Sequence, residues 1–339
     1  MDFVFAALGL AILLFAGDSL VRGAVNLSLR LGVPALIVSL TVVAFGTSAP
    51  ELLISVQSVL EGVPGLALGN VVGSNTANVL LVLGVPALFR GLEFAGCDTR
   101  RNYVYMMLAS VLFILLAFGG QFAWPQGLAL LAGLGLMLSS AVGEAQAHRR
   151  EVKAQLAAEH AARGEALDPD LLEAETEAEE ETEVEGVDPD MAWWKVLMFL
   201  GLGLVGLPLG ADILIDSATH IARHYGVSET AIGLTLVAIG TSLPELATTV
   251  MAAYRNQAEV ALGNVIGSNM FNLLAIIGVA AMVGPLPVDP KLLWSDLWVM
   301  LAASALLAPF VFRGWRMARL WGIVFVLLYA VYLMAILQH

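Results

Sequence analysis

Charged residues are scarce in this chain: of its 339 residues, 13% are charged and 59% are hydrophobic. Soluble domains carry about 25% charged residues, so this composition excludes an ordinary water-soluble globular protein. A mean hydropathy of +0.83 favours an integral membrane protein instead.

Basic residues are outnumbered by acidic ones, which gives a formal net charge of −13. The imbalance is local: residues 144–190 hold sixteen Asp or Glu against four Lys or Arg, a balance of −12, so the remainder carries −1. Strong acidity therefore belongs to one segment, and a nucleic-acid partner has no support. Cysteine is also nearly absent, since the single Cys97 cannot form an intrachain disulfide and has no thiolate metal-site spacing around it.

Long apolar segments are abundant, and ten of them reach the roughly 20 residues needed to cross about 30 Å of hydrocarbon. The expected fold is an all-α integral membrane protein with ten transmembrane helices. Five segments precede the acidic stretch, near residues 3–21, 33–60, 64–89, 103–119 and 124–143. Five follow it, near residues 195–215, 227–254, 259–284, 294–312 and 318–337. The chain accordingly divides into 1–143, an acidic loop at 144–191, and 192–339.

The distribution of Lys and Arg predicts the orientation of these spans. Asp2 is acidic and the first arginines follow the apolar run 3–16, so this run is expected to be a transmembrane helix rather than a signal peptide. With the N-terminus outside, fourteen basic residues collect inside and two, Arg223 and Lys291, lie outside. Both termini are thus predicted outside, and the acidic loop is predicted in the cytoplasm.

The acidic loop is rich in Glu, Ala and Thr, so it cannot bury enough apolar surface to fold alone. Residues 144–163 could extend the preceding helix, and 164–190 are expected to be disordered. Calcium sensing by this loop is an alternative, but no Gly turn with regularly spaced oxygen ligands supports it. A solvated linker is the favoured interpretation.

The two five-span units carry the same sequence motifs. Residues 41–60, TVVAFGTSAPELLISVQSVL, align with 235–254, TLVAIGTSLPELATTVMAAY. Residues 67–84, ALGNVVGSNTANVLLVLG, align with 261–278, ALGNVIGSNMFNLLAIIG, at the same offset of 194. Duplication explains this match, and an odd number of spans per unit predicts that the second unit enters the membrane inverted.

Each unit places one glutamate after a glycine–proline interruption in an apolar segment. Such a break is tolerated in a membrane where the freed carbonyls face a cavity or a ligand. Glu51 and Glu245, at that depth, indicate a cation site near the midplane. The alternatives are an ion pair, for which no basic residue lies in the core of any span, and a protonated, hydrogen-bonded glutamate.

The second motif adds neutral oxygens to each carboxylate. Ser74 and Asn78, like Ser268 and Asn272, are four residues apart and share one helix face. Carboxylate, amide, hydroxyl and carbonyl oxygens suit Ca²⁺ and can accept Na⁺, whereas Mg²⁺ prefers to keep its waters. The absence of His and Cys from the motifs argues against zinc or copper. Possible supporting residues are Asn70, Asn264, Asp18 and Asp212, with a structural role favoured for both aspartates.

These duplicated GTSxPE and GNVxGSN motifs resemble the α-repeats of the calcium/cation antiporter superfamily, in particular prokaryotic sodium/calcium exchangers. The resemblance covers both five-helix units, with α-repeat motifs at 41–84 and 235–278. It implies a prokaryotic inner or plasma membrane protein. Matched position by position, the family's metal ligands fall on Thr47, Ser48, Glu51, Ser74, Asn78, Thr241, Ser242, Glu245, Ser268 and Asn272, with backbone carbonyls at Ala44 and Ala238.

One position departs from the pattern, because some members have Asp where this chain has Asn272. Two carboxylates balance one Ca²⁺, two Na⁺ or two protons. The expected function is Ca²⁺/Na⁺ antiport by alternating access, with no resident cofactor. Ca²⁺/H⁺ or K⁺-dependent exchange at the same site is the alternative, and a cation channel is less favoured. No nucleophile–base pair or metal-ligand cluster indicates an enzyme.

Overall fold

The computed structural model describes residues 2–31, 33, 35–93, 99–163, 191–226 and 238–337. The helices of the first half are α1 (Asp2–Leu31), α2 (Ala35–Val38), η1 (Ser39–Val43), α3 (Ala44–Thr47), α4 (Ala49–Leu60), α5 (Pro64–Ala77), η2 (Asn78–Val82), α6 (Gly84–Phe89), α7 (Arg100–Ala117) and α8 (Trp124–Arg163). Those of the second half are α10 (Trp193–His224), α12 (Ala238–Gly240), α13 (Leu243–Tyr254), α14 (Ala258–Phe271), η4 (Asn272–Ile276), α15 (Ile277–Val283), η5 (Leu292–Asp296), α16 (Leu297–Ala305), α17 (Ala308–Arg313) and α18 (Arg319–Leu337).

The apolar segments of the sequence become long helices. In the described part of the chain, eight helices are long and apolar enough to cross a membrane. The bent run from Ala35 to Leu60 raises this number to nine if it counts as one span. The segment expected at 227–254 lies partly outside the described residues, at 227–237.

Three of the helices extend beyond their expected ranges, and one of them is α10, which continues to His224, nine residues past the predicted boundary at residue 215. Helix α1 continues to Leu31, ten residues past the predicted boundary at residue 21. Helix α8 continues through 144–163 to Arg163, as the possible extension of the fifth span allows. The predicted disorder of 164–190 and the lone Cys97 fall outside the described residues.

The proline-containing segments are interrupted in the same way in both halves. Helices α3 and α4 meet at Ser48, whose φ of −86° and ψ of 4° are not helical, and the chain bends there by 44°. Helices α12 and α13 are separated at the equivalent Ser242, with φ −90° and ψ 5°. The proline that follows each serine has no N–H to continue the preceding helix. The sequence thus breaks the helix immediately before each glutamate.

The second motif of each half also departs from regular α-helix. Wide π-helical turns, η2 and η4, begin at Asn78 and Asn272. Such turns inside α-helices are rare and frequently occur at functional sites. Both predicted amide ligands therefore stand at the first residue of a widened turn.

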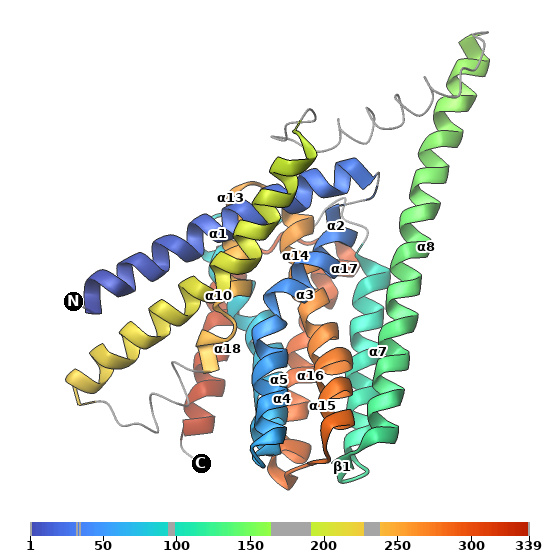
Figure 1. Cartoon of the computed structure of the whole chain (residues 1–339). Helices are drawn as coiled ribbons and strands as arrows, with labels where there is room; N and C mark the ends of the chain where they lie inside the picture. The colour runs from blue at the N-terminus through green and yellow to red at the C-terminus, as the bar shows by residue number, and fades with distance from the viewer. Residues whose placement is uncertain are drawn as a thin grey trace.

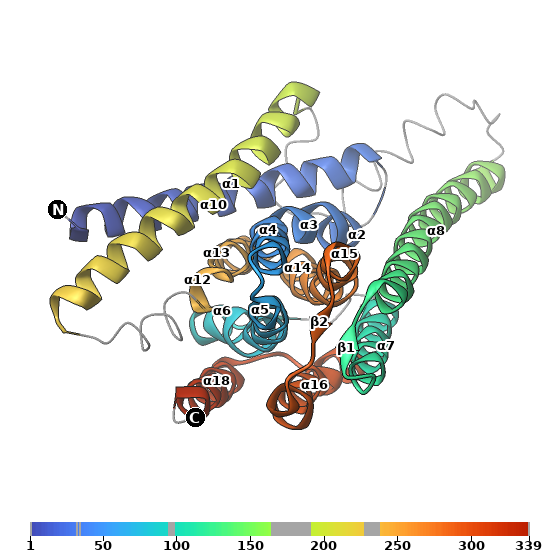
Figure 2. The ribbon, with the colours of Figure 1, turned by 60° about the horizontal axis from the view of Figure 1, so that its bottom comes forward.

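The motif helices occupy the middle of the bundle. Figure 2 shows α4, α5, α13, α14 and α15 at the centre, with α1 and α10 along one side, α7 and α8 along another, and α16 and α18 along a third. Figure 1 shows α8 rising beyond the rest of the bundle. In the described residues one strand pair, β1 (Gln121–Phe122) with β2 (Leu286–Pro287), is antiparallel and joins the two halves at the opposite end.

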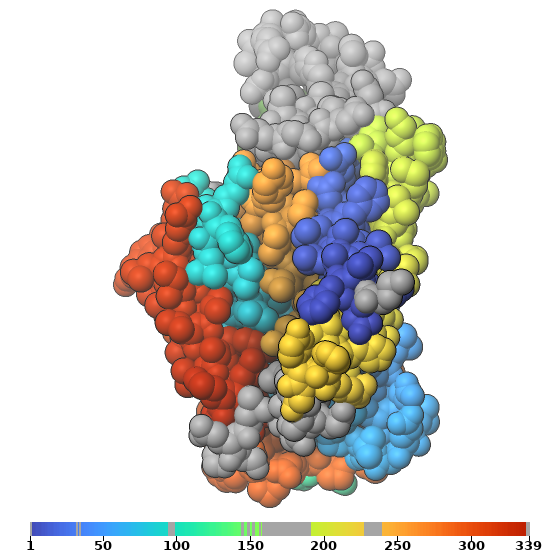
Figure 3. Space-filling model, turned by 90° about the vertical axis from the view of Figure 1, so that its left-hand side faces the viewer, coloured from blue at the N-terminus to red at the C-terminus, as the bar shows by residue number. Residues whose placement is uncertain are grey.

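Small residues set the spacing between these layers. Helices α1 and α10 pack along each other, and a Cβ added to Gly203 would lie 2.5 Å from the Cβ of Leu20. At the centre, a Cβ on Gly267 would lie 2.5 Å from the backbone oxygen of Leu40. Glycine at these positions permits the close helix approach typical of membrane packing. Figure 3 shows α1 and α10 forming a large part of one outer face.

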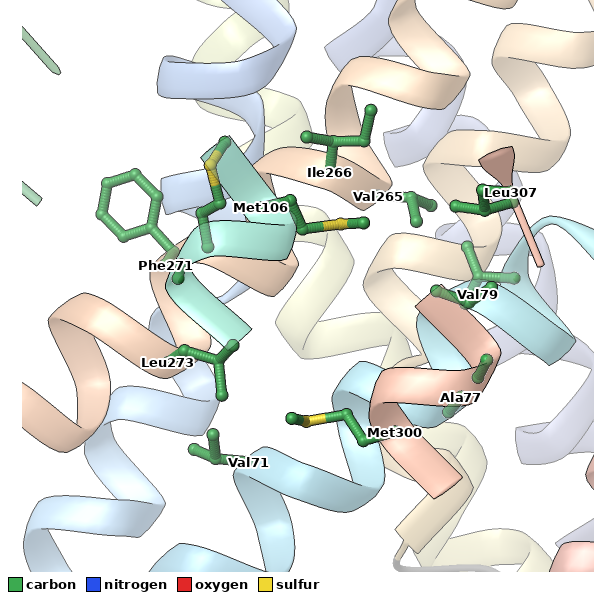
Figure 4. Close-up of a cluster of buried hydrophobic side chains, with 14 of the residues drawn as sticks. Val71, Ala77, Val79, Met106, Val265, Ile266, Phe271, Leu273, Met300 and Leu307 are labelled. Carbon is green, nitrogen blue, oxygen red and sulfur yellow. The ribbon is translucent and has the colours of Figure 1, made fainter. Parts of the chain in front are cut away.

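A buried apolar cluster packs around the central helices. Figure 4 shows part of it, with Met106 of α7 and Met300 of α16 among aliphatic side chains such as Val71 of α5 and Val265 of α14. These side chains are at most 1% exposed. Because protein interiors are close-packed, this cluster holds the polar groups of α5 and α14 in fixed positions.

Candidate ion-binding site

Glu51 and Glu245 lie at equivalent positions in the first turns of α4 and α13. The two side chains are 1% and 0% exposed, respectively. The first turn of a helix has backbone N–H groups without intrahelical partners and carries partial positive charge, so it favours a carboxylate. The helix breaks therefore supply local electrostatic support for two acidic groups in the interior.

Hydroxyl groups of both halves surround Glu245. Ser48 Oγ donates to Glu245 Oε1 at 3.1 Å, and Ser268 Oγ donates to the same oxygen at 3.5 Å. Thr47 Oγ1 lies 3.4 Å from Ser268 Oγ and donates to Asn264 Oδ1 at 3.3 Å. Since Thr47 and Ser48 belong to the first half, the structure joins the two duplicated motifs in one polar site.

Many oxygens of this site have no protein hydrogen-bond partner. Among the described residues, seven such buried oxygens belong to predicted ligands: Glu51 Oε1 and Oε2, Glu245 Oε2, Ser74 Oγ, Ser242 Oγ, Asn78 Oδ1 and Asn272 Oδ1. Buried polar groups are nearly always paired, so a set of acceptors without donors needs an explanation such as an ion. Carboxylate, amide and hydroxyl oxygens are the ligands that hard cations prefer.

Asn70 and Asn264, named from the sequence as possible supports, contact the predicted ligands. Asn264 accepts from Thr47, and its Nδ2 donates to Thr249 Oγ1 at 3.2 Å. Asn70 Oδ1 accepts from Thr241 Oγ1 at 3.5 Å. The contacts of Thr47 with Asn264 and of Thr241 with Asn70 are related by the offset of 194.

The two predicted carbonyl ligands, Ala44 and Ala238, lie shortly before the two helix breaks. The Ala44 carbonyl accepts from Ser48 N at 3.0 Å and lies 3.3 Å from Thr47 Oγ1. Ala238 opens the three-residue helix α12, immediately after the undescribed segment 227–237. The role of both carbonyls as ligands stays a prediction.

Asp18 and Asp212 lie on the outer helices and differ in their surroundings. Asp18 of α1 forms ion pairs with Arg22, at 3.1 Å, and with Arg255, which follows α13. Asp212 is exposed on α10. Asp18 is therefore tied to Arg255, which is 237 residues away, and the structural role expected of both aspartates stays a prediction.

Two further asparagines take part in the site and were not singled out from the sequence. Asn75 and Asn269 are the last residues of the duplicated GSN motifs, and both are 1% exposed. Asn78 Nδ2 donates to Asn269 Oδ1 at 3.1 Å, and Asn272 Nδ2 donates to Asn75 Oδ1 at 3.0 Å. Their identity under the offset of 194 is the signal that could have identified them.

The site has few acidic groups for a metal centre. Over the residues that the structure describes, no cluster of three or more His, Cys, Asp or Glu side chains occurs. Two carboxylates and a larger number of neutral oxygens differ from the His- and Cys-rich ligand sets that bind zinc or copper. The arrangement can hold a hard cation and can balance two positive charges.

Comparison with known proteins places this chain in a defined family. A family model described as sodium/calcium exchanger protein matches residues 1–142 and 195–338, which leaves out only the acidic region and the last residue. The sodium/calcium exchanger MaX1 of Methanosarcina acetivorans is 32% identical over 349 aligned residues, covering 99% of this chain and 98% of MaX1. The inner membrane protein YrbG of Escherichia coli is 33% identical, covering 90% of this chain and 87% of YrbG.

A solved structure gives the same assignment. The sodium–calcium exchanger NCX_Mj, soaked with Na⁺ and Sr²⁺, matches with a TM-score of 0.77 and 28% identity, covering 98% of this chain and 97% of that protein. The fold described above is therefore the fold of a membrane exchanger.

Proposed function

Because the chain belongs to the sodium/calcium exchanger protein family, we propose that it is a secondary antiporter that exchanges Ca²⁺ for Na⁺ across the membrane. The observation that carries the proposal is the set of seven buried oxygens without protein donors around Glu51 and Glu245. The names of MaX1 and NCX_Mj as sodium/calcium exchangers support the choice of ions.

The proposed ligands are the side chains named from the resemblance, together with the carbonyls of Ala44 and Ala238. Glu51 and Glu245 supply two negative charges, which one Ca²⁺ or two Na⁺ would balance. The serine, threonine and asparagine oxygens then complete the coordination without further charge. Ca²⁺ takes six to eight oxygen ligands at about 2.4 Å, and two carboxylates supply at most four, so neutral oxygens must complete its shell. The ions are cargo, and the proposal includes no resident cofactor.

The proposed architecture has ten transmembrane helices in two inverted five-helix repeats. The hydrogen bonds support the repeat, because the contact of Asn78 with Asn269 and that of Asn272 with Asn75 exchange under the offset of 194. A pair of contacts that exchange in this way is what a pseudo-twofold axis between the repeats produces. In the proposed orientation both termini lie outside and the acidic loop lies in the cytoplasm.

The proposed mechanism is alternating access. Binding of Ca²⁺ or of Na⁺ at the same two glutamates neutralises them, and the neutralised site can change the side of the membrane to which it opens. Competition for the same carboxylates couples the two ion flows, because the two glutamates cannot bind Ca²⁺ and Na⁺ at the same time. The alternative is Ca²⁺/H⁺ or K⁺-dependent exchange at the same site, since protons also balance two carboxylates.

Counter-flux in liposomes tests the function. Purified protein is reconstituted, and ⁴⁵Ca²⁺ movement is measured while Na⁺, K⁺ and pH gradients are imposed separately. We expect Ca²⁺ movement to follow the Na⁺ gradient and to stop when the gradient is collapsed. Movement that follows only the pH gradient would assign proton coupling, and Ca²⁺ current without counter-transport would assign a channel. The exposed Glu61→Gln variant is the matched control for loss of a carboxylate outside the site.

A further inference from the structure

Four buried asparagines meet where α5 with η2 faces α14 with η4. They are Asn75, Asn78, Asn269 and Asn272, all at most 1% exposed, and each pair is related by the offset of 194. The flanking Met106 of the apolar core lies 3.8 Å from Asn269 Nδ2 through its sulfur. The asparagines thus form a polar group enclosed by the packed core and not by solvent.

Their hydrogen bonds form one network, in which Asn75 and Asn269 bond to each other at the centre and each accepts from one outer asparagine. Asn78 Nδ2 donates to Asn269 Oδ1 at 3.1 Å, and Asn272 Nδ2 donates to Asn75 Oδ1 at 3.0 Å. In turn, Asn75 Nδ2 donates to the Asn269 carbonyl at 3.2 Å, and Asn269 Nδ2 donates to the Asn75 carbonyl at 3.3 Å. Every side-chain amide nitrogen of the four residues has an acceptor within this network.

The network distinguishes the two ends of the Asn78 and Asn272 amides. An asparagine amide has a donor nitrogen and an acceptor oxygen of nearly equal shape. Here both nitrogens donate to Asn269 or Asn75, and both Oδ1 atoms have no hydrogen-bond partner. Rotating either amide by half a turn would place its oxygen against an oxygen of Asn269 or Asn75. It would also point N–H groups toward the cation.

We propose that Asn75 and Asn269 are positioning residues that hold the amide oxygens of Asn78 and Asn272 toward the transported ion. The proposal rests on the proposed function, since it takes Asn78 and Asn272 as ligands. The assignment is crossed: Asn75 of the first half orients Asn272 of the second, and Asn269 orients Asn78. A neutral amide can serve as a ligand at position 272 because Asn75 fixes which end of it faces the cation.

A double-mutant cycle on the purified full chain tests the crossed assignment. The primary measurement is the half-saturating Ca²⁺ concentration, taken from the rise in Tm as Ca²⁺ is titrated. Asn75→Leu removes the acceptor of Asn272 and keeps the branching of the side chain. It should raise that concentration about tenfold, as the loss of an outer partner of a metal ligand does. The maximum rate of ⁴⁵Ca²⁺ exchange should fall less than the apparent affinity.

The crossed partner supplies the decisive comparison. In an Asn272→Leu background, Asn75→Leu should add little, because the amide that it orients is already gone. In an Asn78→Leu background, the effects of the two substitutions should multiply. Thr76→Val is the matched control: this neighbour is fully buried, and its hydroxyl donates to the Val72 carbonyl, outside the asparagine network. It should leave the half-saturating concentration unchanged.

Several outcomes would overturn the proposal. Equal effects of Asn75→Leu in both backgrounds would indicate a general structural role, and so would equal losses of affinity and of maximum rate. If Asn75→Leu is not monodisperse, Asn75→Ala removes the same oxygen without adding bulk, and the same cycle applies. Ca²⁺ binding without Na⁺-driven exchange in the wild type would overturn the proposed function alone, because the titration still measures the crossed coupling. No effect of Ca²⁺ on wild-type Tm would overturn both.

Discussion

The half-site of Glu245 and the half-site of Glu51 contain equivalent residues but differ in their hydrogen bonds. Glu245 accepts from Ser48 and Ser268. The residues equivalent to these donors, Ser242 and Ser74, have hydroxyl oxygens without partners, and both oxygens of Glu51 are also unpaired. One half-site is therefore closed by hydroxyl groups, and the other presents its carboxylate without them.

The same difference extends to the supporting asparagines. Asn264 Nδ2 donates to Thr249 in the second half. The equivalent atoms of the first half, Asn70 Nδ2 and Ser55 Oγ, are both buried and lack a hydrogen-bond partner. These comparisons give Glu245 more protein hydrogen bonds than Glu51, although Glu245 Oε2 is also without a partner.

The outer helices explain where the asymmetry arises. Ala247 of α13 is 6% exposed, and a Cβ on Gly17 of α1 would lie 3.0 Å from its carbonyl oxygen. The residue equivalent to Ala247 is Leu53 of α4, which is 70% exposed. Helix α1 therefore covers the second half-site at a place where α4 stays uncovered. A duplicated sequence can thus hold one conformation that is not symmetric, as two-sided access requires.

Neutralising either glutamate should have the largest effect, and the two variants should lose exchange alike although the hydrogen bonds of the two half-sites differ. Glu51→Gln and Glu245→Gln each leave one negative charge for a divalent ion, so Na⁺-driven ⁴⁵Ca²⁺ exchange should fall to the background of protein-free liposomes. Loss in both variants is expected despite their different hydrogen bonds, because the charge balance needs both. Glu61→Gln should retain exchange. Retained flux in both site variants would contradict the placement of the site.

The equivalent serines give a smaller effect that should differ between the halves. Ser48→Ala removes a donor to a buried carboxylate, and this should lower the free energy of unfolding by about 1.5–3 kcal/mol. Ser242→Ala removes a hydroxyl that has no partner, so its change should stay within about 0.5 kcal/mol. Unfolding is measured in detergent without Ca²⁺ or Na⁺. Equal changes in the two variants would mean that the asymmetry is not maintained in the purified protein.

The duplicated motifs made much of the site predictable. Glu51 and Glu245 follow prolines that must break a helix, so their shared depth and their place in a first turn follow from local chemistry. Ser74 with Asn78, and their equivalents, share a helix face because of their spacing. The family assignment follows from the same residues, and the family model that matches both halves confirms it.

Other features depend on packing between distant segments. The pairing of Ser48 with Glu245 joins residues 197 positions apart, and no local pattern decides which serine donates to which carboxylate. Asn75 and Asn269 lie about one turn before Asn78 and Asn272. Only the crossing of α5 with α14 gives them a role. The length of α1 past residue 21 was underestimated, because polar residues such as Asp18 and Arg22 suggest a helix end unless their partners are known.

The smallest effect is expected from the ion pair that ties α1 to the second half. Arg255 contacts Asp18, and the two side chains are 25% and 21% exposed. The equivalents of this pair are Asp212 and Glu61, two acids that cannot form an ion pair. The Asp18–Arg255 pair therefore stabilises only the arrangement in which α1 covers α13. A partly exposed pair contributes about 1 kcal/mol.

Arg255→Gln should therefore increase the population in which Ala247 is uncovered by about fivefold, which is the population change that about 1 kcal/mol produces. The measurement is the rate of maleimide labelling of an Ala247→Cys variant, with Cys97→Ser as the background. Labelling of Leu53→Cys in the same background is the matched control and should not change, since α4 is not covered by the pair. Asp18→Asn should reproduce the effect, and the double variant should add nothing to it. An unchanged labelling rate at position 247 would show that apolar packing of α1, without the ion pair, maintains the difference between the two half-sites.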